Sequence, residues 1–343
     1  MTMQRNAYKF PSEKVKGFVN KGLFIEMWYF ECYDEKEDVE FAIMYCINNP
    51  GNHWFGKLLG LGKSADTMVC AAFGEKRRSL NDHFFKTFDA RDDTLKVSMG
   101  DSVFLEAIDD ETIKISGDID DISCKFDLKF TRALPELDAI KTAISKRKAD
   151  NFWFHANMPR ATVTGSLTID GETRTVDCIG YHDHDWGSPT KVAWSPWSVV
   201  TDENFALVTY TSDRKFGHVF LLLDGTWTEM PMPSVTILDH VDCSFAGKRN
   251  DIIQYHRPVK MALVAEKDNI RVEYVMEERP NKYFLFDFGW EWKKKVVHAP
   301  ATVSVNYVTS GKIFKNGAVI KEFSGLNTSF QWYECMDYLD FLK

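Results

Sequence analysis

Hydrophobic and polar residues alternate along most of the chain, so that about every second residue is apolar. The segment 123–132, SCKFDLKFTR, shows this most clearly. Such alternation is typical of an antiparallel strand with one face in the core and one in solvent. Similar segments recur on both sides of residues 133–150, and a DGE sequence at residues 170–172 signals a hairpin between two of them. The pattern predicts an all-β protein.

The pattern changes once, where Leu137, Ile140 and Ile144 are spaced as on one face of a helix and a basic KRK sequence follows. We predict a short connecting helix here. Many short strands in two blocks indicate two antiparallel β-barrels or sandwiches. The predicted organisation is an N-terminal β-domain over residues 1–135, a helical connector over residues 136–150 and a C-terminal β-domain over residues 151–343.

Aromatic residues are abundant, with 26 Phe, 12 Tyr and 10 Trp among 343 residues. Aromatic side chains favour strands, and they also line apolar pockets. A β-rich core explains most of them, so their number is compatible with an apolar ligand site without requiring one.

Charge and cysteine usage restrict the class of protein. The net charge is −8 and the basic residues are scattered, which argues against a nucleic-acid surface. Seven widely spaced cysteines without a CxxC motif suit a reducing compartment. No secretory signal or 18-residue apolar run is visible. We expect a cytoplasmic protein that contacts a membrane, if at all, at its surface to collect an apolar substrate.

The stretch GYHDHDWGSPT is the richest in chemistry. On a strand, alternation places His182, His184 and Trp186 on one face, which the neighbouring apolar residues mark as the interior. Asp183 and Asp185 then lie on the opposite face. There we expect them to accept hydrogen bonds from backbone donors of the following turn.

Three interpretations remain open for His182 and His184. The first is a metal site, which needs a third ligand that His218 or His240 could supply only by chance, so we predict no metal. A buried neutral imidazole can also serve only as a hydrogen-bonding element of the core. The third interpretation is proton transfer in an apolar pocket, because the pKa of imidazole is near neutrality.

Two other segments combine aromatic and polar residues. In NFWFHANMPRA, Trp153 and His155 share a face, and either packing at a domain interface or lining of a pocket would explain them. In NKYFLFDFGWEW, alternation places Asp287 opposite the neighbouring aromatic residues, which predicts an exposed carboxylate.

Three motifs together resemble the carotenoid 1,2-hydratase, or hydroxyneurosporene synthase-like, superfamily. They are EMWYFECYDE at residues 26–35, the segment from FWFHANMPR to GYHDHDWG at residues 152–187, and SFQWYE at residues 329–334. The resemblance implies two lipocalin-like β-domains, a hydrophobic polyene or isoprenoid substrate and no redox cofactor. Tocopherol cyclases and fungal decalin-forming pericyclases are similar to this superfamily.

The resemblance also implies roles for individual residues. The His-x-Trp motif of the hydratases falls on His184 and Trp186, and their downstream tyrosine falls on Tyr210. The hydratases have an acidic residue two positions after that tyrosine, where this chain has Ser212. This difference argues against hydration of a carotenoid itself and leaves the histidine–tyrosine pair in place.

The expected function is cofactor-independent cyclisation or hydration of an isoprenoid or polyene, by protonation of a C=C bond and stabilisation of the carbocation by aromatic faces. Two alternatives remain: a pericyclase for a polyketide polyene, and a lipid or isoprenoid carrier without catalysis. No GxSxG, P-loop or GxGxxG motif occurs, so we expect no nucleotide cofactor. The predicted catalytic residues are His184, His182, Tyr210 and Asp185. The predicted substrate-binding residues are Trp186, Trp153, His155, Trp28, Tyr181 and Trp332.

Overall fold

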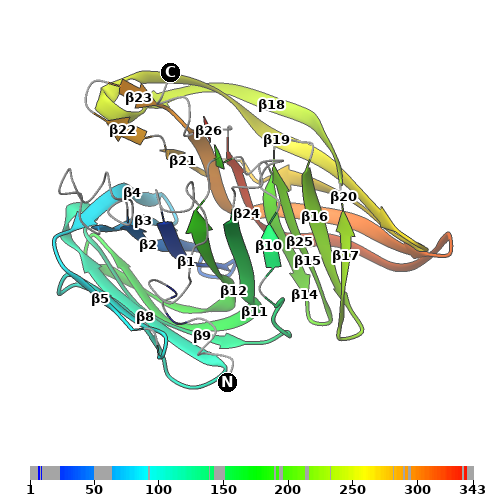
Figure 1. The fold of residues 1–343 in the computed structure, drawn as a ribbon, viewed down its shortest axis with the longest axis horizontal. Coiled ribbons are helices and arrows are strands. Elements are labelled where there is room, and N and C mark those ends of the chain that lie inside the picture. Colours follow the sequence, from blue (N-terminus) through cyan, green and yellow to red (C-terminus); the bar gives the residue numbers. More distant parts are fainter. Residues whose placement is uncertain are drawn as a thin grey trace. The chain divides into compact units, whose positions relative to one another are not determined.

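The fold was obtained as a computed structural model. It describes Ala7, Lys9 and residues 24–49, 64–91, 93–138, 140–142, 151–188, 191–192, 196–212, 216–231, 233–280, 282–288, 290–292, 295–333 and 336–337. These residues form antiparallel strands joined by turns, with two short 3-10 helices, Asp120–Ile122 and Lys248–Asn250, and no α-helix (Figure 1). The all-β prediction is confirmed. In this described part of the chain, no helix is long and apolar enough to cross a membrane.

The described residues divide into two compact units, one ending at residue 188 and the other beginning at residue 191. The first unit is a 12-stranded sheet in the order β4-β3-β2-β1-β12-β11-β9-β8-β7-β6-β5, with β10 paired to β11. Its strands are β1 (Phe24–Asp34), β2 (Val39–Asn49), β3 (Ser64–Phe73), β4 (Lys76–Phe85), β5 (Phe88–Ala90), β6 (Lys96–Met99), β7 (Val103–Ala107), β8 (Thr112–Ile119), β9 (Cys124–Arg132), β10 (Ile140–Thr142), β11 (Asn151–Ile169) and β12 (Glu172–Ser188).

The second unit is a 10-stranded sheet in the order β17-β16-β15-β14-β25-β24-β20-β19-β18, with β21 paired to β24. Its strands are β14 (Trp197–Asp202), β15 (Phe205–Ser212), β16 (Phe216–Leu223), β17 (Thr226–Pro231), β18 (Ser234–Ala246), β19 (Ile252–Lys267), β20 (Ile270–Glu278), β21 (Phe284–Asp287), β24 (Pro300–Lys315) and β25 (Ala318–Tyr333). Two small ribbons complete it: β13 (Lys191–Val192) with β26 (Met336–Asp337), and β22 (Trp290–Trp292) with β23 (Lys295–Val297).

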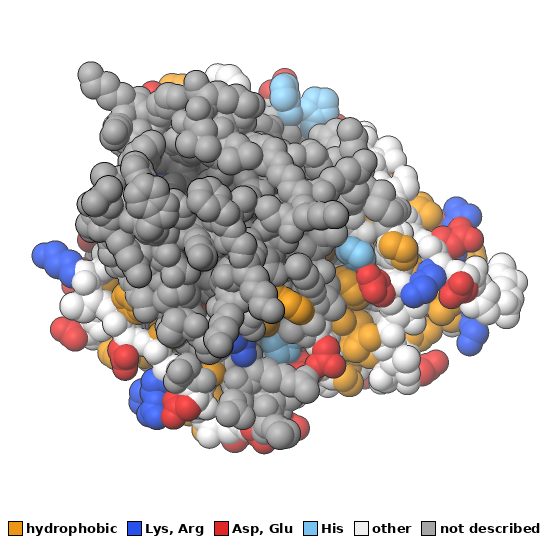
Figure 2. Space-filling model, viewed as in Figure 1, with side chains coloured by type: hydrophobic (Ala, Val, Ile, Leu, Met, Phe, Trp, Pro, Cys, Tyr) orange, Lys and Arg blue, Asp and Glu red, His pale blue; other side chains and the backbone are white. Residues whose placement is uncertain are grey.

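Each unit is a curled antiparallel sheet of the lipocalin-like kind, with its own apolar core. Strand β9 shows how alternation builds the first core, because its residues are alternately buried and exposed from Cys124 to Phe130. The hairpin between β11 and β12 forms where the sequence predicts it. Asp170 and Gly171 both have positive φ, as a two-residue type I′ turn requires. On the face shown in Figure 2, the described acidic and basic side chains are interspersed.

The observed division does not coincide with the expected domain boundary after residue 150. Strands β11 and β12 belong to the sheet of the first unit, where β12 pairs with β1 and β11 pairs with β9. Alternation reveals that a segment is a strand, but it carries no information on which strand will be its neighbour. The N-terminal unit is therefore longer than the sequence suggested.

The predicted connecting helix is wrong over its described part. Residues Ile140–Thr142 form strand β10, paired with residues 152–154 of β11, and residues 143–150 lie outside the described part. The backbone N–H of Leu137 donates to the carbonyl of Ala156 at 3.0 Å. Because this segment finds its hydrogen-bond partners on β11, pairing within the sheet overrides the helix-like spacing of its apolar residues.

Candidate active site

Two imidazoles project from β12 into the apolar core of the first unit. His182 and His184 are both completely buried, and their Cα partners on β1 are Phe30 and Trp28. The ring of His182 stacks on Phe30, with centroids 4.0 Å apart and planes 5° from parallel. His184 stacks on Trp28 at 4.9 Å and 10°, and its centroid lies 4.7 Å from that of Trp186. The expected interior face of β12 is confirmed.

A buried carboxylate fixes the orientation of His184. Its Nε2 atom lies 2.9 Å from Oε1 of Glu26, and both side chains are completely buried. The backbone N–H of Lys9 donates to the same carboxylate, at 2.8 Å from Oε1 and 3.1 Å from Oε2. A carboxylate accepts hydrogen bonds, so Nε2 of His184 carries the ring proton and Nδ1 keeps its lone pair.

Glu26 was missed by the sequence analysis. The available signal was alternation within EMWYF, which puts Glu26 on the same face as Trp28 and Phe30. A charged residue on an otherwise aromatic face at the start of a strand is unusual, because burial of an unpaired charge is costly. Its partner lies 158 residues away in the sequence, so only the pairing of β1 with β12 reveals the dyad.

Both imidazoles of β12 are neutral near pH 7. Burial lowers the pKa of His184 well below its usual range, and the positive charge of Lys9 lowers it further. Burial lowers the pKa of His182 to about 3, although its hydrogen bond to the backbone of Tyr29 opposes that shift. In that bond Nδ1 of His182 donates to the carbonyl oxygen of Tyr29 at 2.9 Å. His182 is thus tied to the backbone of β1, whereas His184 is tied to a carboxylate.

A third imidazole lies on the neighbouring strand. His155 on β11 is completely buried and is the Cα partner of His184. Its Nε2 lies 3.4 Å from Oε2 of Glu136, without the alignment of a hydrogen bond. Glu136 instead accepts a hydrogen bond from Nδ2 of Asn157 at 3.2 Å.

Several polar atoms of this cluster have no hydrogen-bond partner within the described residues. They are Nδ1 of His184, Nε1 of Trp186 and both ring nitrogens of His155. A buried polar atom left unpaired costs about 1–3 kcal/mol, so such atoms are rare unless a water or a ligand satisfies them. These atoms belong to His184 itself and to two residues beside it, and a bound water or the polar group of a ligand would satisfy them.

The opposite face of β12 is also buried, and it carries acids. The hydroxyl of Tyr181 donates to Asp183 at 2.8 Å, and the hydroxyl of Tyr29 donates to Glu31 on β1 at 2.6 Å. Burial raises the pKa of Asp183 well above its usual range, and burial together with the charge of Asp183 does the same for Asp185. The expected role of these aspartates in capping a turn is therefore wrong, since Asp183 binds a tyrosine and Oδ1 of Asp185 has no partner among the described residues.

The structure brings together only some of the predicted site residues. His182, His184, His155, Trp28 and Trp186 meet in the first unit, and Trp153 stacks on Trp186 with centroids 6.2 Å apart. Tyr181 and Asp185 lie on the other face of β12. Tyr210 on β15 and Trp332 on β25 are buried within the second unit.

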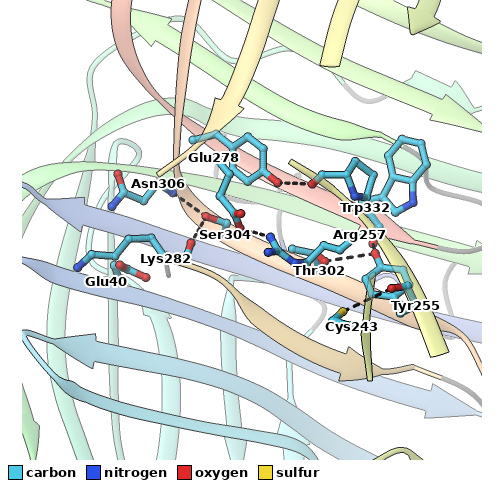
Figure 3. Close-up of polar contacts among 12 residues, drawn as sticks. Glu40, Cys243, Tyr255, Arg257, Glu278, Lys282, Thr302, Ser304, Asn306 and Trp332 are labelled. Carbon is cyan, nitrogen blue, oxygen red and sulfur yellow. Dashed lines mark hydrogen bonds and ion pairs between the residues drawn. The ribbon is translucent and has the colours of Figure 1, made fainter. Parts of the chain in front are cut away.

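The second unit contains a buried polar cluster of its own. Figure 3 shows Arg257 of β19 paired with Glu278 of β20, both buried, and the guanidinium of Arg257 lies 3.6 Å from the ring centroid of Tyr283. On β24, the hydroxyl of Ser304 donates to the carbonyl of Lys282 at 2.5 Å (Figure 3). The desolvation cost of a buried ion pair offsets much of its Coulomb energy, so the pair adds little stability. It does fix the positions of the strands that carry it, which suits a structural role.

The prediction of an exposed Asp287 is wrong. Its side chain is buried, accepts backbone N–H groups of Ala299 at 2.8 Å and Lys248 at 3.0 Å, and lies 2.7 Å from Nδ1 of His298. Strand β21 is short, and its outer face is covered by the segments that supply these donors. Asp287 therefore ties loops to the end of the sheet.

Solved structures show the same fold over nearly the whole chain. They include an AttH-like protein of Nitrosomonas europaea, with a TM-score of 0.56 and 13% identity over 96% of this chain and 97% of that one. CghA solved with Sch210972 has a TM-score of 0.57 and 11% identity, with 91% and 88% covered. Kievitone hydratase of Nectria haematococca has a TM-score of 0.55 and 12% identity, with 97% and 96% covered. The resemblance to the hydratase superfamily is confirmed at the level of the fold.

No curated protein matches the chain in sequence. Residues 19–244 match the model of the Domain of unknown function (DUF7064). The matched range includes the imidazole cluster, that is, His155, His182 and His184. Because this match spans more than half of the chain, the chain belongs to the DUF7064 family.

Proposed function

We propose that this protein is a cofactor-independent lyase or isomerase that cyclises or hydrates a hydrophobic polyene or isoprenoid at the imidazole cluster of the first unit. The observation that carries the proposal is the Glu26–His184 dyad: the indoles of Trp28 and Trp186 flank the His184 ring, and its Nδ1 has no hydrogen-bond partner among the described residues. Kievitone hydratase, a fold neighbour of this chain, is a hydratase by name.

The dyad can act first as an acid and then as a base. When Nδ1 of His184 takes up a proton, the resulting imidazolium is held by the carboxylate of Glu26 as an ion pair. The imidazolium then gives this proton to one carbon of a C=C bond, and the other carbon becomes a cation. The lowered pKa of His184 makes its imidazolium a strong acid, which suits protonation of a weakly basic alkene.

The fate of the cation determines the product. Attack by a second C=C bond of the substrate closes a ring, and the new cation loses a proton to Nδ1 of His184. Attack by water gives an alcohol, and the proton of that water returns to Nδ1. In both cases the dyad is regenerated. The faces of Trp28 and Trp186 flank His184, and a cation over an aromatic face gains about 2 kcal/mol or more when desolvated.

The unpaired polar atoms favour a second candidate, a pericyclase. Such an enzyme needs no proton transfer, only a folded substrate and a hydrogen bond to its carbonyl group. Nε1 of Trp186 and the ring of His155 are donors of this kind. Preorganisation of the reacting atoms can supply about 7–11 kcal/mol of barrier reduction.

Turnover and binding together test the proposal. Purified protein is incubated with linear isoprenoids, prenylated phenols and polyenoyl ketones, and products are identified by mass spectrometry. We expect His184→Ala to abolish turnover while ligand binding persists, and His83→Ala, at a half-buried position of β4 outside the imidazole cluster, to leave both unchanged. Equal turnover in His184→Ala would favour the pericyclase. Binding without turnover in the unaltered protein, for every compound, would favour a carrier.

A further inference from the structure

Three metal-ligating side chains meet on the surface of the second unit, away from any group used above. Asp242 on β18 and His256 on β19 are Cα partners, and His240 precedes Asp242 by two residues on the same strand. All three are exposed, whereas Cys243 and Phe245 of β18 pack against the core. Alternation therefore presents both histidines and the carboxylate on the same outer face of the β18–β19 ribbon.

The ligand atoms of these three side chains are close enough together to coordinate one small ion. Oδ1 of Asp242 lies 2.5 Å from Nδ1 of His256 and 3.8 Å from Nε2 of His240. One ligand atom from each residue lies within 4.8 Å of the other two. Ligand atoms around a tetrahedral zinc ion lie about 3.3 Å apart, given metal–ligand distances near 2.0–2.1 Å. Small side-chain rotations are sufficient to reach this geometry.

The backbone beneath the cluster supports such a site. The two histidines come from adjacent strands of one hydrogen-bonded ladder, so their separation is set by sheet geometry and not by a loop. The pairing is irregular at Asp239, directly before His240. Bulges of this kind redirect neighbouring side chains and are over-represented next to functional sites. Three protein ligands would leave at least one coordination position of a tetrahedral ion open to water.

We propose that His240, Asp242 and His256 form a binding site for a divalent transition metal, with zinc as the reference ion. Two imidazoles and a carboxylate are ligands that suit zinc, copper and nickel. Because β18 ends the sheet order of the second unit, the bound metal joins an edge strand to its neighbour. An ion that binds the folded state alone stabilises it. The site is independent of the proposed catalytic function.

The test uses zinc chloride and the full chain after dialysis against a chelator. Titration calorimetry should show one zinc ion per chain, and zinc should raise the thermal midpoint. In His256→Ala and in Asp242→Asn we expect affinity to fall at least tenfold and the thermal shift to disappear. His83→Ala, which removes a half-buried histidine of the first unit, should behave as the unaltered protein.

Because the three side chains are exposed, these variants should fold normally, and circular dichroism checks this. Absence of zinc binding in the unaltered protein would overturn the proposal. Equal zinc affinity in the unaltered protein and in His256→Ala would overturn it too, since the ion would then be bound elsewhere.

Discussion

Nε2 of His184 lies 2.9 Å from Oε1 of Glu26, and no part of either side chain is exposed to solvent. The two residues come from neighbouring strands, β12 and β1, so the rigid ladder between these strands fixes the dyad. A carboxylate that binds one imidazole nitrogen determines which nitrogen remains available to a ligand. The contact with Glu26, and not the pair of histidines on β12 alone, determines that Nδ1 is the nitrogen of His184 that can exchange a proton with a ligand.

Replacing Glu26 with Gln should reduce turnover about 100-fold with little change in fold, because acid–base groups contribute roughly 10²–10⁴ to rates. The amide cannot stabilise an imidazolium on His184 as a carboxylate does. The measurement is kcat together with far-ultraviolet circular dichroism. Glu172→Gln, on an exposed part of β12, is the control and should retain full activity. Full activity in Glu26→Gln would show that the dyad is only structural.

Replacing His155 with Phe should leave the unfolding free energy unchanged or raise it by about 1–3 kcal/mol, since two unpaired ring nitrogens are removed. Ligand affinity should nevertheless fall about tenfold if a polar group of the ligand binds there. Urea unfolding and a binding titration measure the two effects. The matched variant His182→Phe removes a satisfied hydrogen bond to Tyr29 and should destabilise the protein. If both variants lose stability equally, the ring of His155 is not unsatisfied.

Stability should fall as the pH is lowered from about 6.5 to 3, in part because of His182. Its pKa is about 3 in the folded state, against about 6.5 when unfolded, so only the unfolded chain binds the proton in this range. The loss attributable to this group is roughly 4 kcal/mol at pH 3. Urea unfolding at several pH values should show a shallower dependence in His182→Phe. An unchanged slope in that variant would contradict the burial of a neutral imidazole.

Asp185 should lower the unfolding free energy as the pH rises, whereas His182 lowers it as the pH falls. Its raised pKa means that the folded state holds a proton that the unfolded state has lost, so its contribution favours folding at low pH and is lost as the pH rises above the ordinary pKa of aspartate. Asp185→Asn is neutral at every pH and keeps the shape of the side chain. We expect it to be more stable than the unaltered protein at pH 8 and nearly equal at pH 4. Lower stability of the variant at pH 8 would indicate an ionised, partnered Asp185.

Sequence reasoning predicted the faces of individual strands well and their surroundings poorly. Alternation placed His182, His184 and Trp186 together in the interior, as observed. It also placed Asp183 and Asp185 on an outer face, but that face is buried as well. Periodicity distinguishes two faces of a strand, yet it cannot show whether one or both will be covered.

Long-range pairing explains the other differences. Glu26 joins the site because β1 lies beside β12, and residues 140–142 form a strand because β11 lies beside them. Neither contact leaves a local signature, since pairing partners are selected by the whole sheet. The resemblance to the hydratase superfamily predicted the fold of both units, while the roles of His184 and Tyr210 stay predictions.

The nitrogen-15 chemical shifts of the His184 ring test the central claim most directly, and they require no substrate. At pH 7 we predict a neutral ring with the proton on Nε2 and an unprotonated Nδ1, and loss of this tautomer preference in Glu26→Leu, whose side chain offers no acceptor to Nε2. A ring protonated on Nδ1, or an imidazolium at pH 7, would contradict the proposed dyad.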